Sequence, residues 1–301
     1  MSELWPRVWS VGTFDGVHRG HQALLHRAAA LAHDWGEAFG VVTFDPPPAA
    51  VLRGPDAVWE LTPLAEKVRR LGALDVPRVE VLAFTPAFAA RSAEEFAEEV
   101  LGRQLKARAL VEGYNFTYGR GGRGTVETLT QWGRRRGVEV VTVGPVLHQG
   151  AAISSSRIRQ AIRAGDLALA AALLGRPYSA SGAVVHGDGR GRALGFPTAN
   201  LALEPRKAMP PFGVYAGRAQ VAGTSRPAVA SWGLRPMYAV DRPLLEVHLL
   251  EGGADLYGTP LEFEFHFYLR PERRFSGVEE LRRAVTDDIA AARRLLAGAA
   301  S

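Results

Sequence analysis

The sequence predicts two domains of different fold class. Residues 1–178 are expected to form a doubly wound α/β domain with a parallel sheet, because short apolar segments alternate there with helical segments over short connections. Residues 179–301 are expected to form a small antiparallel β-barrel of Greek-key type with one C-terminal helix, because the apolar residues recur there with period two. A chain of 301 residues is long enough for two hydrophobic cores.

In the first half, apolar segments predict strands at residues 8–11, 39–44, 78–84, 108–111 and 138–143. Helices are predicted at about residues 22–32, 62–71, 92–105, 125–136, 154 or 155 to 164, and 166–174. Some of these helices have recognisable ends. Ser92-Ala-Glu-Glu95 is a capping box, Thr125 is a favourable N-cap, and Asp166 and Gly175 bound the last helix.

In the second half, strands are predicted at residues 180–186, 214–221, 228–232, 244–250 and 261–269, followed by a helix at about 278–296. The last strand has the clearest pattern, because Leu261, Phe263, Phe265 and Phe267 all fall on one face. Such alternation is typical of an antiparallel strand with one buried face.

The composition excludes several classes of site. The chain has no cysteine, so disulfides, thiol catalysis and cysteine-ligated metal centres are ruled out. A formal net charge of +5 suits anionic small substrates, and it also suits nucleic acid. No apolar run is long enough to cross a membrane, and the first residues lack the pattern of a signal peptide, so we expect a cytoplasmic protein.

The first candidate site is the stretch Gly12-Thr-Phe-Asp-Gly-Val-His-Arg-Gly-His21, which joins the first predicted strand to the first helix. A helix start offers unpaired N–H groups and a partial positive charge to a phosphate. His18 and His21, placed at that helix start, are suited to stabilising negative charge that grows during phosphate transfer. The alternative is that both are ordinary surface histidines.

Two later segments of the first half also have the features of anion sites. Residues 113–124 form a glycine-rich loop that contains Asn115 and two arginines, and a plain surface hairpin is the alternative. Ile153-Ser-Ser-Ser-Arg-Ile-Arg159 places three hydroxyls and two arginines at a helix start. These serines can cap the helix and orient a ligand at the same time.

The second half carries Gly187-Asp-Gly-Arg-Gly-Arg-Ala-Leu-Gly-Phe-Pro-Thr-Ala-Asn200. Its glycines predict a mobile loop, and Thr198 and Asn200 lie on the same side of an extended segment. A hydroxyl and an amide at this spacing suit a magnesium–nucleotide pair. On the strand at 244–250, Glu246 lies on the face opposite the apolar residues and is therefore available to a ligand. The alternative for Glu246 is a solvated surface charge.

Taken together, these motifs resemble those of the prokaryotic bifunctional riboflavin kinase/FAD synthetases (FMN adenylyltransferases). The Gly12–His21 stretch, Thr43-Phe-Asp-Pro-Pro-Pro48, residues 113–124 and residues 153–159 resemble motifs of the family's nucleotidyltransferase domain, with Tyr118 and Ser156 in place of the usual Phe and Thr. Gly-Phe-Pro-Thr-Ala-Asn200 resembles the signature of riboflavin kinases. One segment departs from the family, since Ser231-Trp232 replaces Asn-Ile. The resemblance extends from about Val11 to Leu295.

The resemblance implies that the C-terminal domain transfers the γ-phosphoryl group of ATP to riboflavin and forms FMN. Thr198 would then coordinate Mg²⁺, Asn200 would hold the nucleotide–metal assembly as a possible second ligand, and Glu246 would accept the proton of the riboflavin 5′-hydroxyl. The remaining residues implied for ATP or flavin binding are Gly187, Gly189, Gly195 and Pro197.

For the N-terminal domain, the resemblance implies adenylylation of FMN by ATP, which yields FAD and pyrophosphate. His18 and His21 would stabilise the charge on the α-phosphate, and no covalent enzyme intermediate is needed because the FMN phosphate is the nucleophile. The residues implied for ATP and phosphate binding are Gly12, Phe14, Asp15, Gly20, Asn115, Ser155, Ser156 and Arg159.

Two other hypotheses remain open at the level of sequence. One is a monofunctional kinase whose N-terminal half is inactive, against which intact His18 and His21 argue. The other is a flavin- or RNA-binding regulator without turnover, which aromatic residues interleaved with basic ones would favour, and such residues occur only at Tyr114–Tyr118. We expect small-molecule substrates and no nucleic acid, membrane or obligate protein partner.

Overall fold

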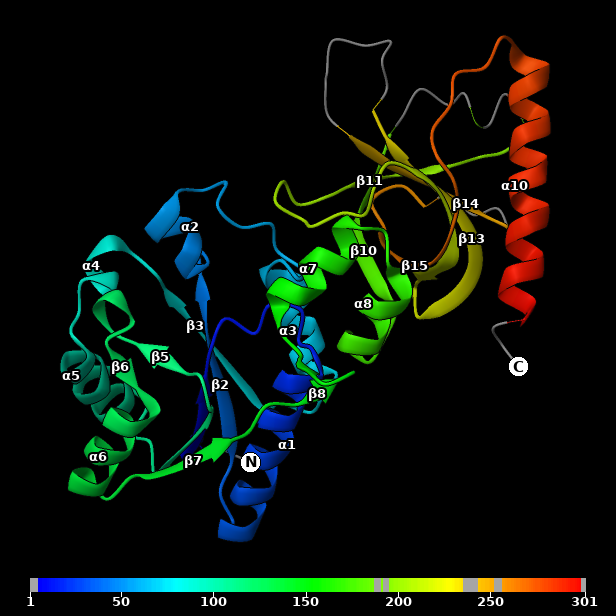
Figure 1. The fold of residues 1–301 in the computed structure, drawn as a ribbon. Helices are drawn as coiled ribbons and strands as arrows, with labels where there is room; N and C mark the ends of the chain where they lie inside the picture. Colours follow the sequence, from blue (N-terminus) through cyan, green and yellow to red (C-terminus); the bar gives the residue numbers. More distant parts are fainter. Residues whose placement is uncertain (1–4, 187–190, 192–194, 235–242, 252–255, 299–301) are drawn as a thin grey trace. The chain divides into compact units, whose positions relative to one another are not determined.

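The computed structural model describes residues 5–186, 191, 195–234, 243–251 and 256–298. The chain divides into two compact units, Met1–Ser155 and Ser156–Ser301, and each has its own sheet (Figure 1). Across these described ranges, no helix has both the length and the apolar character that crossing a membrane requires.

The first unit is built on a parallel sheet with the strand order β3-β2-β1-β4-β7. The strands are β1 (Val8–Val11), β2 (Phe39–Asp45), β3 (Arg78–Ala83), β4 (Ala109–Gly113) and β7 (Glu139–Val143). The chain adds β2 and β3 on one side of β1 and then returns to add β4 and β7 on the other side. The switch point of this doubly wound sheet therefore lies between β1 and β4, where ligands usually bind at the carboxyl ends of the strands.

Helices cover both faces of this sheet (Figure 1). On one face, α1 (Arg19–Trp35) and α3 (Leu64–Gly72) bury Leu25, Ala28, Leu31 and Leu71 against β1, β2 and β4. On the other face, η1 (Phe96–Gln104), a π-helix continuous with α5 (Ala93–Glu95), and α6 (Val126–Arg136) pack around Trp9. The expected doubly wound architecture is confirmed.

The helix starts follow the capping chemistry of the sequence. Ser92 and Glu95 form the expected capping box, and Thr125 caps α6. The first helix begins at Arg19, earlier than predicted, because the side chain of His18 acts as its N-cap. The shorter elements are α2 (Pro48–Arg53), α4 (Pro86–Ala89), η2 (Arg120–Gly122), the hairpin of β5 (Thr117–Tyr118) with β6 (Gly124–Thr125), and the hairpin of β8 (Leu147–His148) with β9 (Ala151–Ala152).

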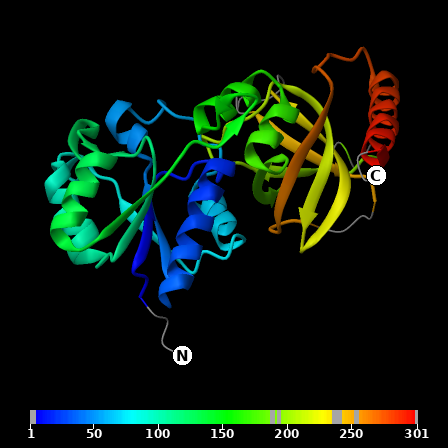
Figure 2. The same cartoon turned by 60° about the horizontal axis from the view of Figure 1, so that its bottom comes forward.

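The second unit begins with α7 (Ser155–Arg163) and α8 (Leu167–Leu174), which are followed by a closed antiparallel barrel with the order β10-β11-β14-β13-β12-β15. Its strands are β10 (Tyr178–Val185), β11 (Ala199–Ala202), β12 (Gly213–Val221), β13 (Thr224–Gly233), β14 (Leu244–Leu249) and β15 (Pro260–Arg270). The helix α10 (Val278–Gly298) packs along β12, β13 and β15 (Figure 2). Asp288 of α10 is buried and forms an ion pair with Arg270 of β15. The expected barrel with a C-terminal helix is confirmed.

The last barrel strand departs in one detail from its sequence pattern. Leu261, Phe263 and Phe265 are buried, as the alternation predicts. The register of β15 with β12 is then irregular between Ala216 and Gly217, and Phe267 packs in a cluster with Ala292 of α10. A β-bulge of this kind changes the face on which the following residues lie, so the single apolar face predicted through Phe267 ends at Phe265.

A buried carboxyl group lies where β1 and β4 meet. The registered pairs of these strands end at Trp9 and Leu110, and the N–H group of Val11 donates to the side chain of Glu112 (2.9 Å). Glu112 is 1% exposed, and burial raises its pKa well above the ordinary value of 4.5. The side chain of Glu112 thus accepts the hydrogen bond of the Val11 N–H group at the switch point of the sheet.

Replacing Glu112 by Gln should remove a pH dependence of stability while keeping the acceptor for Val11. A raised pKa means that the stabilising contribution of Glu112 is complete below pH 4.5 and is lost as the pH rises through the pKa of the folded state. We therefore expect the free energy of unfolding of Glu112→Gln, relative to that of wild type, to be higher at pH 8 than at pH 4.5. Denaturant unfolding at both pH values measures this difference. Glu112→Ala, which leaves the Val11 donor unpaired, should be less stable than wild type by about 1–3 kcal/mol at pH 4.5, where the carboxyl group is protonated. Identical pH profiles for wild type and Glu112→Gln would contradict this account.

Candidate active sites

The first candidate site lies in the turn that joins β1 to α1, at the switch point of the parallel sheet. His18 has extended backbone dihedral angles, and its Nδ1 accepts a hydrogen bond from the backbone N–H of His21 (3.3 Å). An accepting Nδ1 carries no proton, so the hydrogen of a neutral His18 is on Nε2. The capping interaction therefore sets the tautomer of His18 and the direction in which it can donate.

The two histidine rings stack on each other, with ring centroids 3.6 Å apart and an interplanar angle of 15°. Part of His21 remains accessible, but its Nδ1 is buried and has no hydrogen-bond partner among the described residues. Burial, and then the positive charges of His18 and Lys67, lower the pKa of His21 well below 6.5. His21 is therefore a neutral imidazole at pH 7.

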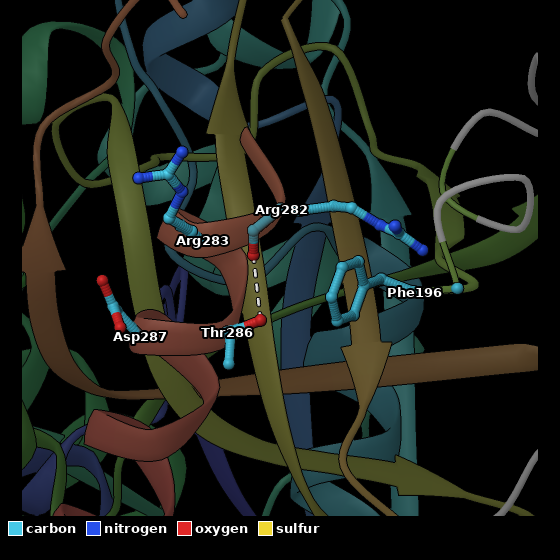
Figure 3. A pocket seen from close by; sticks show the side chains of 6 residues that line it. Phe196, Arg282, Arg283, Thr286 and Asp287 are labelled. Carbon is cyan, nitrogen blue, oxygen red and sulfur yellow. Dashed lines mark hydrogen bonds between the residues drawn. The ribbon is translucent and has the colours of Figure 1, made fainter. Parts of the chain in front are cut away.

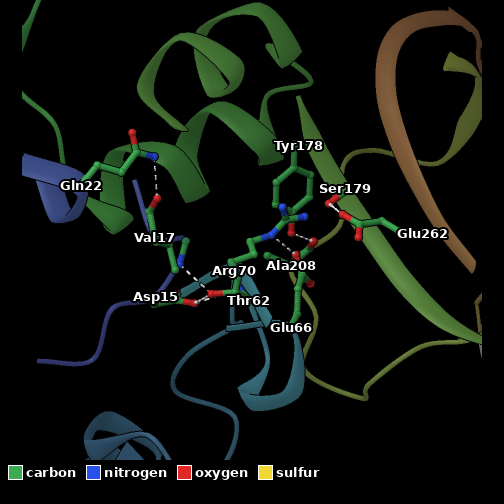
Figure 4. A network of polar contacts seen from close by, with 11 residues as sticks. Asp15, Val17, Gln22, Thr62, Glu66, Arg70, Tyr178, Ser179, Ala208 and Glu262 are labelled. Atoms are coloured by element: carbon green, nitrogen blue, oxygen red, sulfur yellow. Dashed lines mark hydrogen bonds and ion pairs between the residues drawn. The ribbon is translucent and has the colours of Figure 1, made fainter. Parts of the chain in front are cut away.

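The turn before α1 is strained and is braced from a neighbouring loop. Phe14 and Val17 both have positive φ angles (47° and 43°), which non-glycine residues rarely adopt. The carboxylate of Asp15 accepts hydrogen bonds from the N–H groups of Leu61 (3.1 Å) and Thr62 (2.9 Å), and Gly16 donates to the hydroxyl of Thr62 (2.8 Å). Figure 4 shows Asp15 against Thr62, together with the hydrogen bond from Gln22 to Val17. These hydrogen bonds of Asp15 and Gly16 thus hold the turn in place.

Three more predicted residues, Gly12, Gly20 and Ser155, belong to the same turn or contact it. A Cβ atom on Gly20 would lie 3.1 Å from the ring of His18, so glycine is favoured there, and a Cβ on Gly12 would lie 3.2 Å from the ring of Phe14. Ser155, the first residue of α7, donates to the backbone carbonyl of Asp15 (2.8 Å).

Three further predicted residues lie outside this group of contacts. Asn115 is exposed and lies just beyond β4, at the carboxyl edge of the sheet, which is also where the turn after β1 lies. Ser156 and Arg159 follow Ser155 on α7 and belong to the second unit.

One residue of this region was not singled out from the sequence. Lys67 of α3 is 2% exposed, and its Nζ donates to the hydroxyl of Thr43 (3.4 Å) at the end of β2. The sequence spacing indicates its burial, because Lys67 and the buried Leu71 lie one helical turn apart on the same face of α3. It is also one of only three lysines in an arginine-rich chain.

The second candidate site lies on the barrel, where β11, β14 and β13 run side by side. Asn200 of β11 is the register partner of Glu246 of β14, and Glu246 is also the partner of Ser231 of β13. Directly paired residues project from the same face of a sheet, so these three side chains are neighbours. Asn200 is buried and Glu246 is half-buried. The structure thus brings together two residues that lie far apart in the sequence.

The segment that leads into β11 is held against β14. His248 bonds through Nδ1 to the carbonyl of Pro197 (2.8 Å), and its ring meets that of Phe196 edge to face. Because a carbonyl only accepts, His248 is the donor, and its Nδ1 carries the proton. Exposed Thr198 follows directly. Gly187 and Gly189, also predicted here, lie outside the described residues.

A cavity of about 490 Å³ lies beside this segment (Figure 3). The segment before β11 and one face of α10 form its walls. The lining residues are Gly195, Phe196, Arg282, Arg283, Thr286 and Asp287. Its volume is within the range of small-molecule sites. It combines an aromatic ring with charged groups of both signs.

A second carboxylate near Glu246 was also missed from the sequence. Glu272 packs directly on Gly233, where a Cβ atom would overlap its carboxylate. Burial raises the pKa of Glu272, and the negative charge of Glu246 adds to this effect. Nothing in the local pattern around Glu272 indicates this contact, because it depends on where β13 ends.

The neutral state of His21 can be tested directly. Its lowered pKa means that its stabilising contribution is present above pH 6.5 and is lost as the pH falls through the pKa of the folded state. We expect the imidazole nitrogen resonances of His21, followed by NMR, to show a midpoint well below 6.5. The exposed His33 provides a control resonance in the same helix. A midpoint for His21 at or above 6.5 would contradict the assignment.

Comparison with known protein families gives two matches along the chain. A family model described as FAD synthetase matches residues 2–157, and one described as riboflavin kinase matches residues 174–296. The first covers the turn with His18 and His21, and the second covers the strands that carry Asn200 and Glu246. Each candidate site thus lies within a different family match.

Individual relatives match over nearly the whole chain. A bifunctional riboflavin kinase/FMN adenylyltransferase of Bacillus subtilis (strain 168) is 37% identical over 93% of this chain and 90% of the relative, and one of Pseudomonas fluorescens is 40% identical over 97% and 94%. A crystal structure from Streptococcus pneumoniae, described as a macrolide-efflux protein, matches with a TM-score of 0.86 and 32% identity over 97% of this chain and 95% of that chain. The chain therefore belongs to the bifunctional riboflavin kinase/FMN adenylyltransferase family.

Proposed function

We propose that this chain makes FAD from riboflavin in two ATP-dependent steps, with one site in each unit. The observation that carries the proposal is that each family match contains its own group of neighbouring polar residues. His18 and His21 stack at the start of α1, and Asn200 and Glu246 are paired across two barrel strands. ATP, riboflavin and FMN are the substrates of this family, and FMN and FAD are its products.

In the kinase step, Glu246 accepts the proton of the riboflavin 5′-hydroxyl as its oxygen attacks the γ-phosphorus of ATP, and ADP leaves. The pairing of Glu246 with Asn200 supports this role, because it places the carboxylate beside the segment that binds nucleotide. The cavity lined by Gly195 and Phe196 is large enough for a flavin ring. Pro197 lies between this cavity and Thr198, and we assign Gly187 and Gly189 to the same binding loop.

The residues around Glu246 also fit a magnesium ion. Thr198 offers a hydroxyl, Asn200 an amide oxygen and Glu246 a carboxylate, and oxygen is the ligand atom that Mg²⁺ prefers. Thr198 and, as a second ligand, Asn200 would hold the ion. When bound, the ion neutralises charge on the ATP phosphates, while the protein holds the nucleotide through the segment that His248 fixes at Pro197.

In the adenylylation step, an oxygen of the FMN phosphate attacks the α-phosphorus of ATP, the α–β bond breaks and pyrophosphate leaves. His18 and His21 donate hydrogen bonds to the α-phosphate, and the N–H groups at the start of α1 add to them. The braced turn supports this role, because fixed donors need no rearrangement during the reaction. We assign ATP positioning to Asn115, Ser155, Ser156 and Arg159, and the shape of the turn to Gly12, Phe14, Asp15 and Gly20.

We place the boundary between the two functions after residue 178, at the start of the first barrel strand, β10 (Tyr178–Val185). We also propose a cytoplasmic location, since both reactions consume ATP and the matched relatives are bacterial. Only small molecules take part in either reaction, so neither step requires nucleic acid, a membrane or a protein partner.

Two substitutions should separate the two activities. The wild-type chain, incubated with riboflavin, ATP and Mg²⁺, should produce FMN and then FAD, followed by chromatography. His21→Ala should stop the reaction at FMN, because it removes a donor to the α-phosphate. Glu246→Ala should slow FMN formation by about 10²–10⁴-fold and leave the conversion of supplied FMN to FAD intact.

The outcome that contradicts this assignment is also clear. If Glu246→Ala abolished both conversions, the two sites would not be independent. If the wild-type chain formed FMN without FAD, the synthetase function would be wrong. Omitting Mg²⁺ and adding a chelator should stop FMN formation, which tests the metal separately.

A further inference from the structure

A lysine is buried beneath the N-terminal site. Lys67 lies on the inner face of α3 with 2% of its surface exposed, beside Leu71, which is completely buried. Removing an ammonium group from water is costly unless it is paired with a carboxylate and fully hydrogen-bonded. A methionine of similar volume would fill the same space without that cost. A structural role alone therefore does not explain a lysine at this position.

The hydrogen bonds of Lys67 lead to the turn that carries the histidines. Its Nζ donates to the hydroxyl of Thr43 (3.4 Å), and that hydroxyl donates to the backbone carbonyl of Thr13 (3.2 Å). Thr13 lies between Gly12 and Phe14, in the turn before α1. Nζ has no second hydrogen-bond partner in the part of the chain that the structure describes. Two of its three N–H groups are therefore left for another acceptor.

The charges around Lys67 only partly compensate its own. Asp15 of the turn, Glu60 before α3 and Asp45 of β2 attract the ammonium group, but burial outweighs them and lowers its pKa below 10.5. Its charge also acts on the first candidate site, where it contributes to the low pKa of His21. The positive field of Lys67 thus extends to the place where the ATP phosphates are proposed to bind.

We propose that Lys67 is a further positioning residue for adenylyl transfer, which fixes the turn through Thr43 and Thr13 and adds a positive charge close to His21. This inference rests on the proposed function of the N-terminal site. In this arrangement the ammonium group of Lys67 attracts the phosphates of ATP toward His21, which is neutral at pH 7. The histidines then orient the α-phosphate, and the lysine holds the turn that carries them.

The test compares Lys67→Met with Lys106→Met, a substitution of an exposed lysine in the same unit. We expect Lys67→Met to lower kcat for FMN to FAD at least tenfold with a smaller change in KM for FMN. Riboflavin phosphorylation by the same chain should change less than twofold, which provides an internal control for folding. The NMR midpoint of His21 should rise in Lys67→Met, because a positive charge has been removed. Lys106→Met should alter none of these quantities.

A second variant separates positioning from charge. Thr43→Val keeps the volume of a buried side chain and breaks the link from Lys67 to Thr13. It should lower kcat for FAD formation while leaving the NMR midpoint of His21 low. If Lys67→Met did not fold, Thr43→Val would decide the question by the same assay.

Full FAD synthesis in Lys67→Met, or an unchanged midpoint of His21, would overturn the inference. Equal loss of both activities in Lys67→Met would reduce Lys67 to a structural residue and would also overturn it. The proposed function fails separately, since it requires His21→Ala to stop the reaction at FMN whatever Lys67→Met does.

Discussion

The constraint on which the N-terminal unit depends is the turn between the end of β1 and the start of α1. Two non-glycine residues in it, Phe14 and Val17, have positive φ angles, and each such residue costs on the order of 1–3 kcal/mol. The two hydrogen bonds that Asp15 accepts from Leu61 and Thr62 involve a charged group, and each contributes about 1.5–3 kcal/mol. These hydrogen bonds, which brace the turn, are therefore of the right magnitude to offset the strain.

This brace has consequences for the two histidines, for the start of α1 and for Lys67. It sets where α1 begins, so that His18 caps the helix and stacks on His21. It ties the turn to the loop before α3, the helix that carries Lys67. The histidines, the helix N–H groups and the buried ammonium are held by one set of contacts, and a phosphate would meet a site that is already formed.

The barrel positions its residues by a different device, which is strand register. Asn200, Glu246 and Ser231 are neighbours because β11, β14 and β13 pair at those residues. A slip of one residue would turn Glu246 to the opposite face, where the buried Leu245 and Val247 now lie. The alternating apolar residues prevent that slip, so the hydrophobic core of the barrel is also what places the proposed general base.

Local chemistry was sufficient to predict much of this molecule from sequence. The capping residues Ser92, Thr125 and Asp166, the positions of the long strands and the two fold classes are confirmed, because they depend on neighbouring residues and on periodicity. The site motifs were equally visible, and their roles remain proposals. Tertiary structure alone decided the short strand β11, the bulge before Phe267, the burial of Lys67 and Glu112, and the contact of Glu272 with Gly233. Each of these depends on a segment distant in sequence, and no local pattern encodes which distant segment will approach.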